Sequence, residues 1–113
     1  MTPVDDWSDV SIGNIPIGQG IAVTPLQLIN AYAAIANGGV MPQPHLLKRI
    51  GDEPAAHYPQ RRVISARTAA TMRNMFEAVV TDDHGTGQTA GITGYSVAGK
   101  TGTANVAGRN GYI

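Results

Sequence analysis

The residues of this chain best suited to do chemistry lie in the stretch 94–103, which reads Gly-Tyr-Ser-Val-Ala-Gly-Lys-Thr-Gly-Thr. Two catalytic patterns overlap there. The phosphate-loop pattern G-x-x-x-x-G-K-[ST] runs from Gly94 to Thr101, and in such loops backbone N–H groups and the lysine bind nucleotide phosphates. The K-T-G pattern, found in serine enzymes that form an acyl intermediate, runs from Lys100 to Gly102. The two patterns predict different proteins, so the surrounding elements must decide between them.

The sequence on either side of the lysine favours the K-T-G interpretation. A phosphate loop needs a buried strand before its first glycine and a helix that begins at its lysine, because the helix N-terminus binds the phosphates. Residues 85–93 are too polar and too rich in glycine for a buried strand, and the glycines that follow the lysine oppose a helix. The apolar β-forming residues lie inside the supposed loop, at 95–98. We therefore expect a strand over residues 95–103, and nucleotide binding is the less favoured alternative.

The composition of the chain excludes several classes of function. Lys+Arg and Asp+Glu both number 8, so the zero formal net charge argues against binding to nucleic acid or to an anionic membrane surface. Cysteine is absent, which excludes disulfides and thiolate metal sites, and the three histidines show no metal-binding spacing. We expect no metal and no cofactor. The longest apolar stretch falls far short of the ~20 residues that span a bilayer, and the sequence shows no export signal.

Residues 25–37 carry the clearest helix signal. Thr24 is suited to the N-cap, Pro25 to the first helical position, and Gln27 can complete a capping box with Thr24. The sequence Asn-Gly-Gly at 37–39 supplies an exit through left-handed backbone conformations. Apolar residues recur at helical spacing on a broad face, so we expect this helix to be largely buried.

The remaining elements are expected from shorter patterns. Residues 1–20 predict an irregular segment with a short strand near Ile15 to Ile17, and the run from His45 to Ile50 predicts another strand. Ser65 can cap a second helix that ends by His84-Gly85. Asn110-Gly111 predicts a hairpin whose second strand begins at Tyr112. With 113 residues the chain suits one small domain, and the unpaired strand leads us to expect a fragment of a longer one.

Four ordered blocks of sequence resemble the transpeptidase domain of class B penicillin-binding proteins, the D,D-transpeptidases that cross-link peptidoglycan. The pattern is most similar to the cell-division (septal) group. The resemblance implies an α/β (α+β) fold with an antiparallel sheet flanked by helices, and it makes residues 1–113 the C-terminal portion of that domain. The K-T-G residues would lie on the strand that lines the active site. The blocks are residues 15–28, 31–39, 85–87 and 97–104.

The resemblance also implies a role for each residue of the K-T-G stretch. Lys100 would be catalytic, placing its positive charge near the substrate carboxylate and the hydroxyls that relay protons. Thr101 and Thr103 would bind the carboxylate of a D-Ala-D-Ala stem peptide or of a β-lactam. Gly102 would allow the substrate to approach the strand closely. The backbone N–H of Thr103 would be one donor to the oxyanion.

The sequence departs from the family in two motifs. It contains neither S-x-x-K, which carries the family's nucleophilic serine and base lysine, nor S-x-N. Without a nucleophile the chain alone is expected to be inactive. The resemblance implies a parent protein at the extracytoplasmic face of the cell membrane, anchored through a segment outside this sequence, with cell-division proteins as partners. A non-catalytic module of the same fold, used for ligand binding or assembly, is the alternative.

Overall fold

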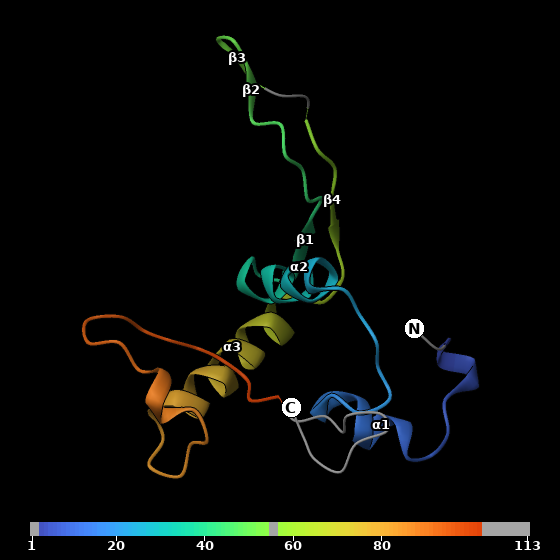
Figure 1. Cartoon of the computed structure of the whole chain (residues 1–113), viewed down its shortest axis with the longest axis vertical. Coiled ribbons are helices and arrows are strands. Elements are labelled where there is room, and N and C mark those ends of the chain that lie inside the picture. The colour runs from blue at the N-terminus through green and yellow to red at the C-terminus, as the bar shows by residue number, and fades with distance from the viewer. Residues whose placement is uncertain (1–2, 55–56, 103–113) are drawn as a thin grey trace.

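The computed structural model describes residues 3–54 and 57–102. Two helices, α2 (Pro25–Ala36) and α3 (Ala66–Thr81), form the body, and Figure 1 shows a β arm projecting from α2 on the side away from α3. The arm contains two antiparallel ladders, in which β1 (Val40–Pro42) pairs with β4 (Gln60–Arg62) and β2 (Arg49–Ile50) pairs with β3 (Glu53–Pro54). The other elements are short helical turns: η1 (Val4–Asp6), α1 (Ser11–Asn14), η2 (Ile15–Ile17) and η3 (Gln88–Ala90).

Helix α2 begins with the expected capping box. The backbone N–H of Gln27 donates to Thr24 Oγ1 at 3.2 Å, and the backbone N–H of Thr24 donates to Gln27 Oε1 at 2.8 Å. These two bonds satisfy N–H groups that have no partner within the helix. The helix ends at Ala36, and the chain leaves it through Gly38 and Gly39, whose φ angles are +62° and +91°. The prediction of this helix from its start and stop signals is confirmed.

The expected burial of α2 is wrong. Within this helix only Ala34 is buried, at 2 % exposure, whereas Leu26 and Ile29 are 60 % and 66 % exposed. Helix α3 and strand β1 both contact α2, and Tyr32 packs against Phe76 of α3 with ring centroids 5.7 Å apart. Neither contact covers Leu26 or Ile29, so an apolar face that the sequence marks as core lies at the surface of the described residues.

Helix α3 is capped as the sequence predicted. Ser65 Oγ accepts from the backbone N–H of Thr68 at 3.0 Å, and the helix runs to Thr81. Its inward face contains Ala69, which is fully buried, and Val80, which is 8 % exposed. The chain therefore places a small-residue contact near the start of α3 and a larger apolar contact near its end.

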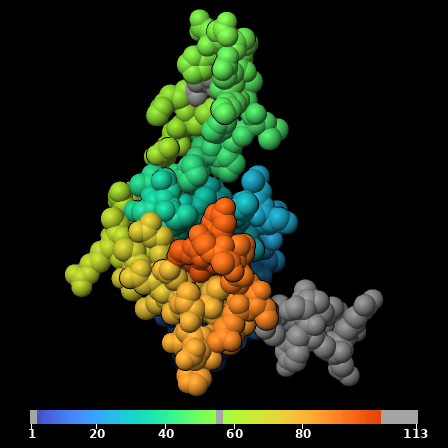
Figure 2. All heavy atoms as spheres, turned by 90° about the vertical axis from the view of Figure 1, so that its left-hand side faces the viewer, coloured from blue at the N-terminus to red at the C-terminus, as the bar shows by residue number. Residues whose placement is uncertain are grey.

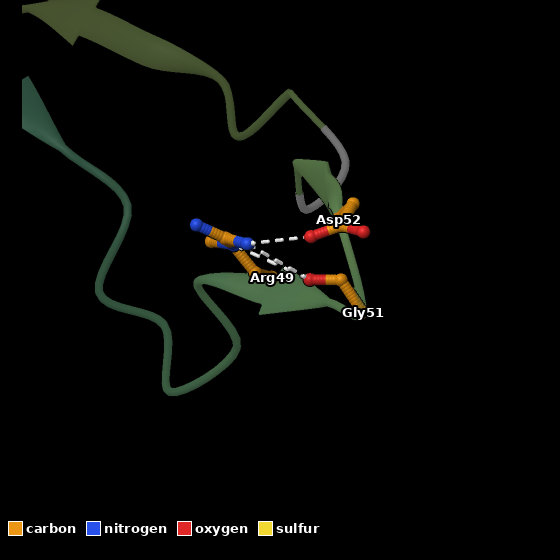
Figure 3. Close-up of polar contacts among 3 residues, drawn as sticks. All are labelled: Arg49, Gly51 and Asp52. Atoms are coloured by element: carbon orange, nitrogen blue, oxygen red, sulfur yellow. Dashed lines mark hydrogen bonds and ion pairs between the residues drawn. The ribbon is translucent and has the colours of Figure 1, made fainter.

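Two predicted strands differ from the structure. Residues 15–17 form the 3₁₀ turn η2, because helical backbone angles continue through Ile15 and the turn closes at Gly18 with φ +98°. The run from 45 to 50 forms a ladder only at Arg49–Ile50, where Gly51 closes the hairpin and Arg49 bonds to Gly51 and Asp52 (Figure 3). Residues 45–48 have no partner strand among the described residues, and a strand needs one. The predicted hairpin at 110–111 lies outside the described residues.

The packing is sparse for a chain of this length. The Cα radius of gyration is 17.2 Å, compared with about 13 Å for a compact domain of the same size. Figure 2 shows the β arm standing away from the body that α2 and α3 form. Only three apolar side chains of the described residues, Ala34, Ala69 and Val80, are buried. Within residues 3–54 and 57–102, no helix is sufficiently long and apolar to cross a bilayer.

Candidate active-site segment

The segment that carries the K-T-G residues follows helix α3 without joining a sheet. Residues 95–102 contain no strand in the structure, so the predicted strand over 95–103 is wrong for the residues described. A strand exists only where a neighbouring strand accepts and donates its backbone hydrogen bonds. Here the contact is with a helix, because the backbone N–H of Gly99 donates to the carbonyl of Phe76 in α3 at 3.0 Å. The segment passes beside α3 in Figure 1.

A side-chain contact fixes the segment just before the K-T-G residues. Ser96 Oγ donates a hydrogen bond to Glu77 Oε1 of helix α3. Together with the Gly99 backbone bond, it ties the segment to α3 at two points three residues apart. Because a hydrogen bond to an ionised carboxylate is stronger than one between neutral groups, Glu77 contributes to the placement of this segment. No role for Ser96 or Glu77 was predicted from the sequence.

The predicted site residues lie together and are open to solvent. Lys100, Thr101 and Gly102 are all exposed. The Lys100 ammonium group donates to the backbone carbonyl of Thr101 at 2.8 Å, and the Thr101 hydroxyl lies 3.4 Å from the hydroxyl of Thr86. Among the described residues, a Cβ at Gly102 would meet no atom within 4 Å. The fourth predicted residue, Thr103, lies outside the described residues.

A small hollow adjoins these residues. Its volume is about 150 Å³, which is below the ~300 Å³ at which pockets begin to enclose drug-sized ligands. The hollow is therefore too small to enclose such a ligand by itself. Helix α3, the turn after it and the K-T-G segment line the hollow, through Val79, Val80, Gly87, Ala90, Gly99, Lys100 and Thr101.

The surroundings of Lys100 do not match a phosphate loop. Between residues 85 and 93 the structure contains the short 3₁₀ turn η3 and no strand, and no helix begins at Lys100 within the residues described up to 102. The stacked N–H groups of a helix N-terminus, which bind phosphate, are therefore missing from this segment. In the described residues, no group of three or more His, Cys, Asp or Glu side chains is arranged to bind a metal ion.

Sequence comparison places the whole chain in one family. The family model described as "Penicillin binding protein transpeptidase domain" matches residues 2–113. The chain is 46% identical over 112 residues to the penicillin-binding protein PbpB of Mycobacterium tuberculosis, covering 90% of this chain and 16% of that protein. It is 37% identical over 105 residues to the peptidoglycan D,D-transpeptidase FtsI of Escherichia coli, covering 93% of this chain and 17% of that protein. The chain thus spans about a sixth of the length of these curated relatives.

Structural comparison agrees with the sequence. Penicillin-binding protein 3 of M. tuberculosis in complex with ampicillin superposes with a TM-score of 0.79 at 42% identity, covering all of this chain and 28% of that one. The apo transpeptidase domain of penicillin-binding protein 3 from Burkholderia pseudomallei gives a TM-score of 0.80 at 33% identity, covering 99% of this chain and 34% of that one. The predicted class, helices with antiparallel sheet, is confirmed. The chain therefore belongs to the penicillin-binding protein transpeptidase domain family.

Proposed function

We propose that this chain provides the K-T-G segment of a septal-type D,D-transpeptidase, a serine enzyme that cross-links peptidoglycan and is acylated by β-lactams. The observation that carries the proposal is that Lys100 and Thr101 are exposed beside a hollow, on a segment that is hydrogen-bonded to α3. They lie in a chain that the transpeptidase family model matches over residues 2–113. Further support comes from relatives that are named as peptidoglycan D,D-transpeptidases and from a similar structure that is complexed with ampicillin.

In this proposal each residue of the segment acts on the substrate carboxylate or on the reacting groups. The Lys100 ammonium supplies positive charge and takes part in proton transfer, and Thr101 and Thr103 donate hydroxyl hydrogen bonds to the carboxylate. Gly102 leaves room for the substrate backbone, and the N–H of Thr103 stabilises the oxyanion of the tetrahedral intermediate. These roles use an exposed lysine, an exposed threonine and a glycine whose Cβ position is open.

The proposed reaction proceeds in two acyl transfers. A serine oxygen attacks the carbonyl carbon between the two D-alanines, the C–N bond breaks, and D-alanine leaves with a proton as the acyl-enzyme ester forms. An amine of a neighbouring stem peptide then attacks the ester, the ester C–O bond breaks as the amide cross-link forms, and the proton lost by the amine passes to the serine oxygen. With a β-lactam the ring C–N bond opens and the leaving nitrogen remains attached. The attacking serine comes from a part of the domain outside this sequence, which has no S-x-x-K motif.

The proposed setting of the parent protein is the extracytoplasmic face of the cell membrane. Its substrates there are stem peptides ending in D-Ala-D-Ala, its inhibitors are β-lactams, and its partners are proteins of cell division. A non-catalytic ligand-binding or assembly module of the same fold is the second candidate, favoured by the absence of S-x-x-K and S-x-N from the sequence.

Labelling with a fluorescent penicillin separates the two candidates. The chain is purified alone and also co-expressed with a segment of the family domain that carries S-x-x-K and S-x-N. We expect covalent label on the serine-bearing segment only when both are present, and Lys100→Gln is the matched variant that should reduce it. Label on this chain alone would reveal an unrecognised nucleophile. No label on the complex, despite stable association, would support the non-catalytic module.

A further inference from the structure

We propose that Thr86 is a positioning residue for Thr101, a role that rests on the proposed function. The two hydroxyl oxygens lie 3.4 Å apart although the residues are 15 positions apart in the sequence. Thr86 belongs to the turn Gly85-Thr86-Gly87, which follows helix α3. In the sequence this turn stands out only as a block of family resemblance, which implies no role for its threonine.

Close packing against the end of α3 excludes a side chain at Gly85 and leaves little room for one at Gly87. A Cβ on Gly85 would lie 2.4 Å from the carbonyl oxygen of Val79, and a Cβ on Gly87 would lie 3.0 Å from Val79 Cγ1. Neither glycine has a positive φ angle, so the requirement is space and not backbone conformation. The turn can therefore lie directly on α3 only because Gly85 lacks a side chain, whereas a side chain at Gly87 would require Val79 to shift.

Hydrogen bonds hold the turn at that position. The N–H of Gly87 donates to the Val79 carbonyl at 2.9 Å, and the N–H of Gly85 donates to the Asp82 carbonyl at 2.8 Å. The Gln88 side-chain amide also donates to the Asp82 carbonyl, at 2.7 Å. Thr86 thus stands between two residues that are fixed to the end of α3.

A separate hydrogen bond holds the segment that carries Thr101 against the same helix. Gly99, two residues before Thr101, donates its N–H to the Phe76 carbonyl of α3. Gly87 and Thr101 also line the same hollow, so the turn and the K-T-G segment border one another there. Helix α3 is therefore a common support that sets the separation of the Thr86 and Thr101 hydroxyls.

The chemistry of two adjacent hydroxyls indicates how Thr86 acts. A hydroxyl has one proton to donate and two lone pairs to accept, whereas a carboxylate only accepts. When Thr101 donates to a ligand carboxylate, its oxygen is free to accept from the Thr86 hydroxyl. That bond selects the Thr101 rotamer aimed at the ligand and polarises its O–H group. Thr86 thereby favours carboxylate binding without itself touching the ligand.

The test is a pair of matched substitutions in the intact transpeptidase that carries this sequence. Thr86→Val keeps the shape of the side chain and removes the hydroxyl, and Thr86→Ser keeps the hydroxyl. We expect Thr86→Val to reduce the second-order rate of acylation by benzylpenicillin about three- to tenfold, the effect of one hydrogen bond at the surface. Thr86→Ser should restore the rate, and Thr86→Val should add little in a Thr101→Val background.

Each other outcome has a defined meaning. A wild-type rate for Thr86→Val, or the same loss in the Thr101→Val background, would overturn the positioning role while leaving the proposed function intact. An unacylated wild-type protein would overturn both. The thermal midpoint of every variant is measured alongside, and Thr86→Ala serves as a second hydroxyl-free variant if Thr86→Val fails to fold.

Discussion

Gly99 and Phe76 are joined by a backbone hydrogen bond of 3.0 Å, in which the N–H of Gly99 donates to the carbonyl of Phe76. This bond fixes the residue immediately before Lys100 to the middle of helix α3. A second contact, from Ser96 to Glu77, lies three residues earlier in the segment. The position of the lysine therefore depends on the integrity of α3 as well as on its own segment.

Removal of the Ser96 hydroxyl should loosen the segment that carries Lys100. We expect Ser96→Ala to lower the free energy of unfolding by about 0.5 to 1 kcal/mol, because the bond it removes is exposed and partly replaced by water. Amide hydrogen exchange at Gly99 should become faster. Thr93→Ala, at an exposed residue of the preceding turn, is the matched control. Unchanged exchange at Gly99 would show that the backbone bond holds the segment without Ser96.

A methyl group at Gly85 should destabilise the domain. The added Cβ would collide with the Val79 carbonyl oxygen, so we expect Gly85→Ala to cost about 1 to 3 kcal/mol. Gly13→Ala is the control, because a Cβ at Gly13 would meet nothing within 4 Å. Urea denaturation of the two variants measures the difference. Equal midpoints for both would mean that the turn lies farther from α3 than the structure places it.

The capping box of α2 should contribute measurably to stability. Thr24→Ala removes the acceptor for the Gln27 N–H, and we expect a loss of about 1 kcal/mol. Thr24→Ser retains the acceptor and should lose at most a few tenths of a kcal/mol. Thermal unfolding monitored by circular dichroism compares the two. A loss of the same size in both would indicate that the threonine methyl group, and not the cap, is responsible.

The isolated chain should associate through the apolar face of α2. Leu26 and Ile29 are 60 % and 66 % exposed, and few apolar side chains are buried elsewhere in the described residues. We expect the purified chain to elute as oligomers or aggregates, and the double substitution Leu26→Gln with Ile29→Gln to shift it toward monomer. The matched control is the double substitution Val10→Gln with Ile12→Gln, at two exposed apolar residues outside α2. A monodisperse wild-type monomer with a cooperative thermal transition would contradict this.

The lysine itself should be needed for acylation. In the intact transpeptidase we expect Lys100→Met to reduce the rate of acylation by benzylpenicillin about 100-fold or more, as removal of a group that assists proton transfer does. Lys100→Arg keeps the charge and should retain part of the rate. Stopped-flow competition with a fluorescent penicillin measures both. If the acylation rate of Lys100→Met stays within a few-fold of the wild-type rate, Lys100 is only a solvated surface charge and does not assist catalysis.

Features set by neighbouring residues were predictable from the sequence. Thr24 with Gln27 and Ser65 with Thr68 cap their helices as expected, because an N-cap depends on residues three positions apart. Family resemblance identified the K-T-G residues, and the structure places Lys100, Thr101 and Gly102 side by side and exposed.

Features set by distant residues were not predictable. The apolar residues at 95–98 favour a strand, yet a ladder needs a partner strand, and here the segment bonds to Phe76 and Glu77 of a helix. Likewise, the face around Leu26 and Ile29 has the composition of a core, but burial depends on what packs against it. The contact between Thr86 and Thr101 spans 15 positions, so no local pattern indicates it.

The most direct test of the central claim is a crystal structure of the intact transpeptidase that carries this sequence, acylated by ampicillin. We predict that the ligand carboxylate lies within hydrogen-bond distance of the Thr101 and Thr103 hydroxyls, with the Lys100 ammonium beside it. An acylated protein whose carboxylate is bound by other residues, with residues 100–103 remote from the ligand, would contradict the claim that this segment forms the carboxylate-binding wall of the site.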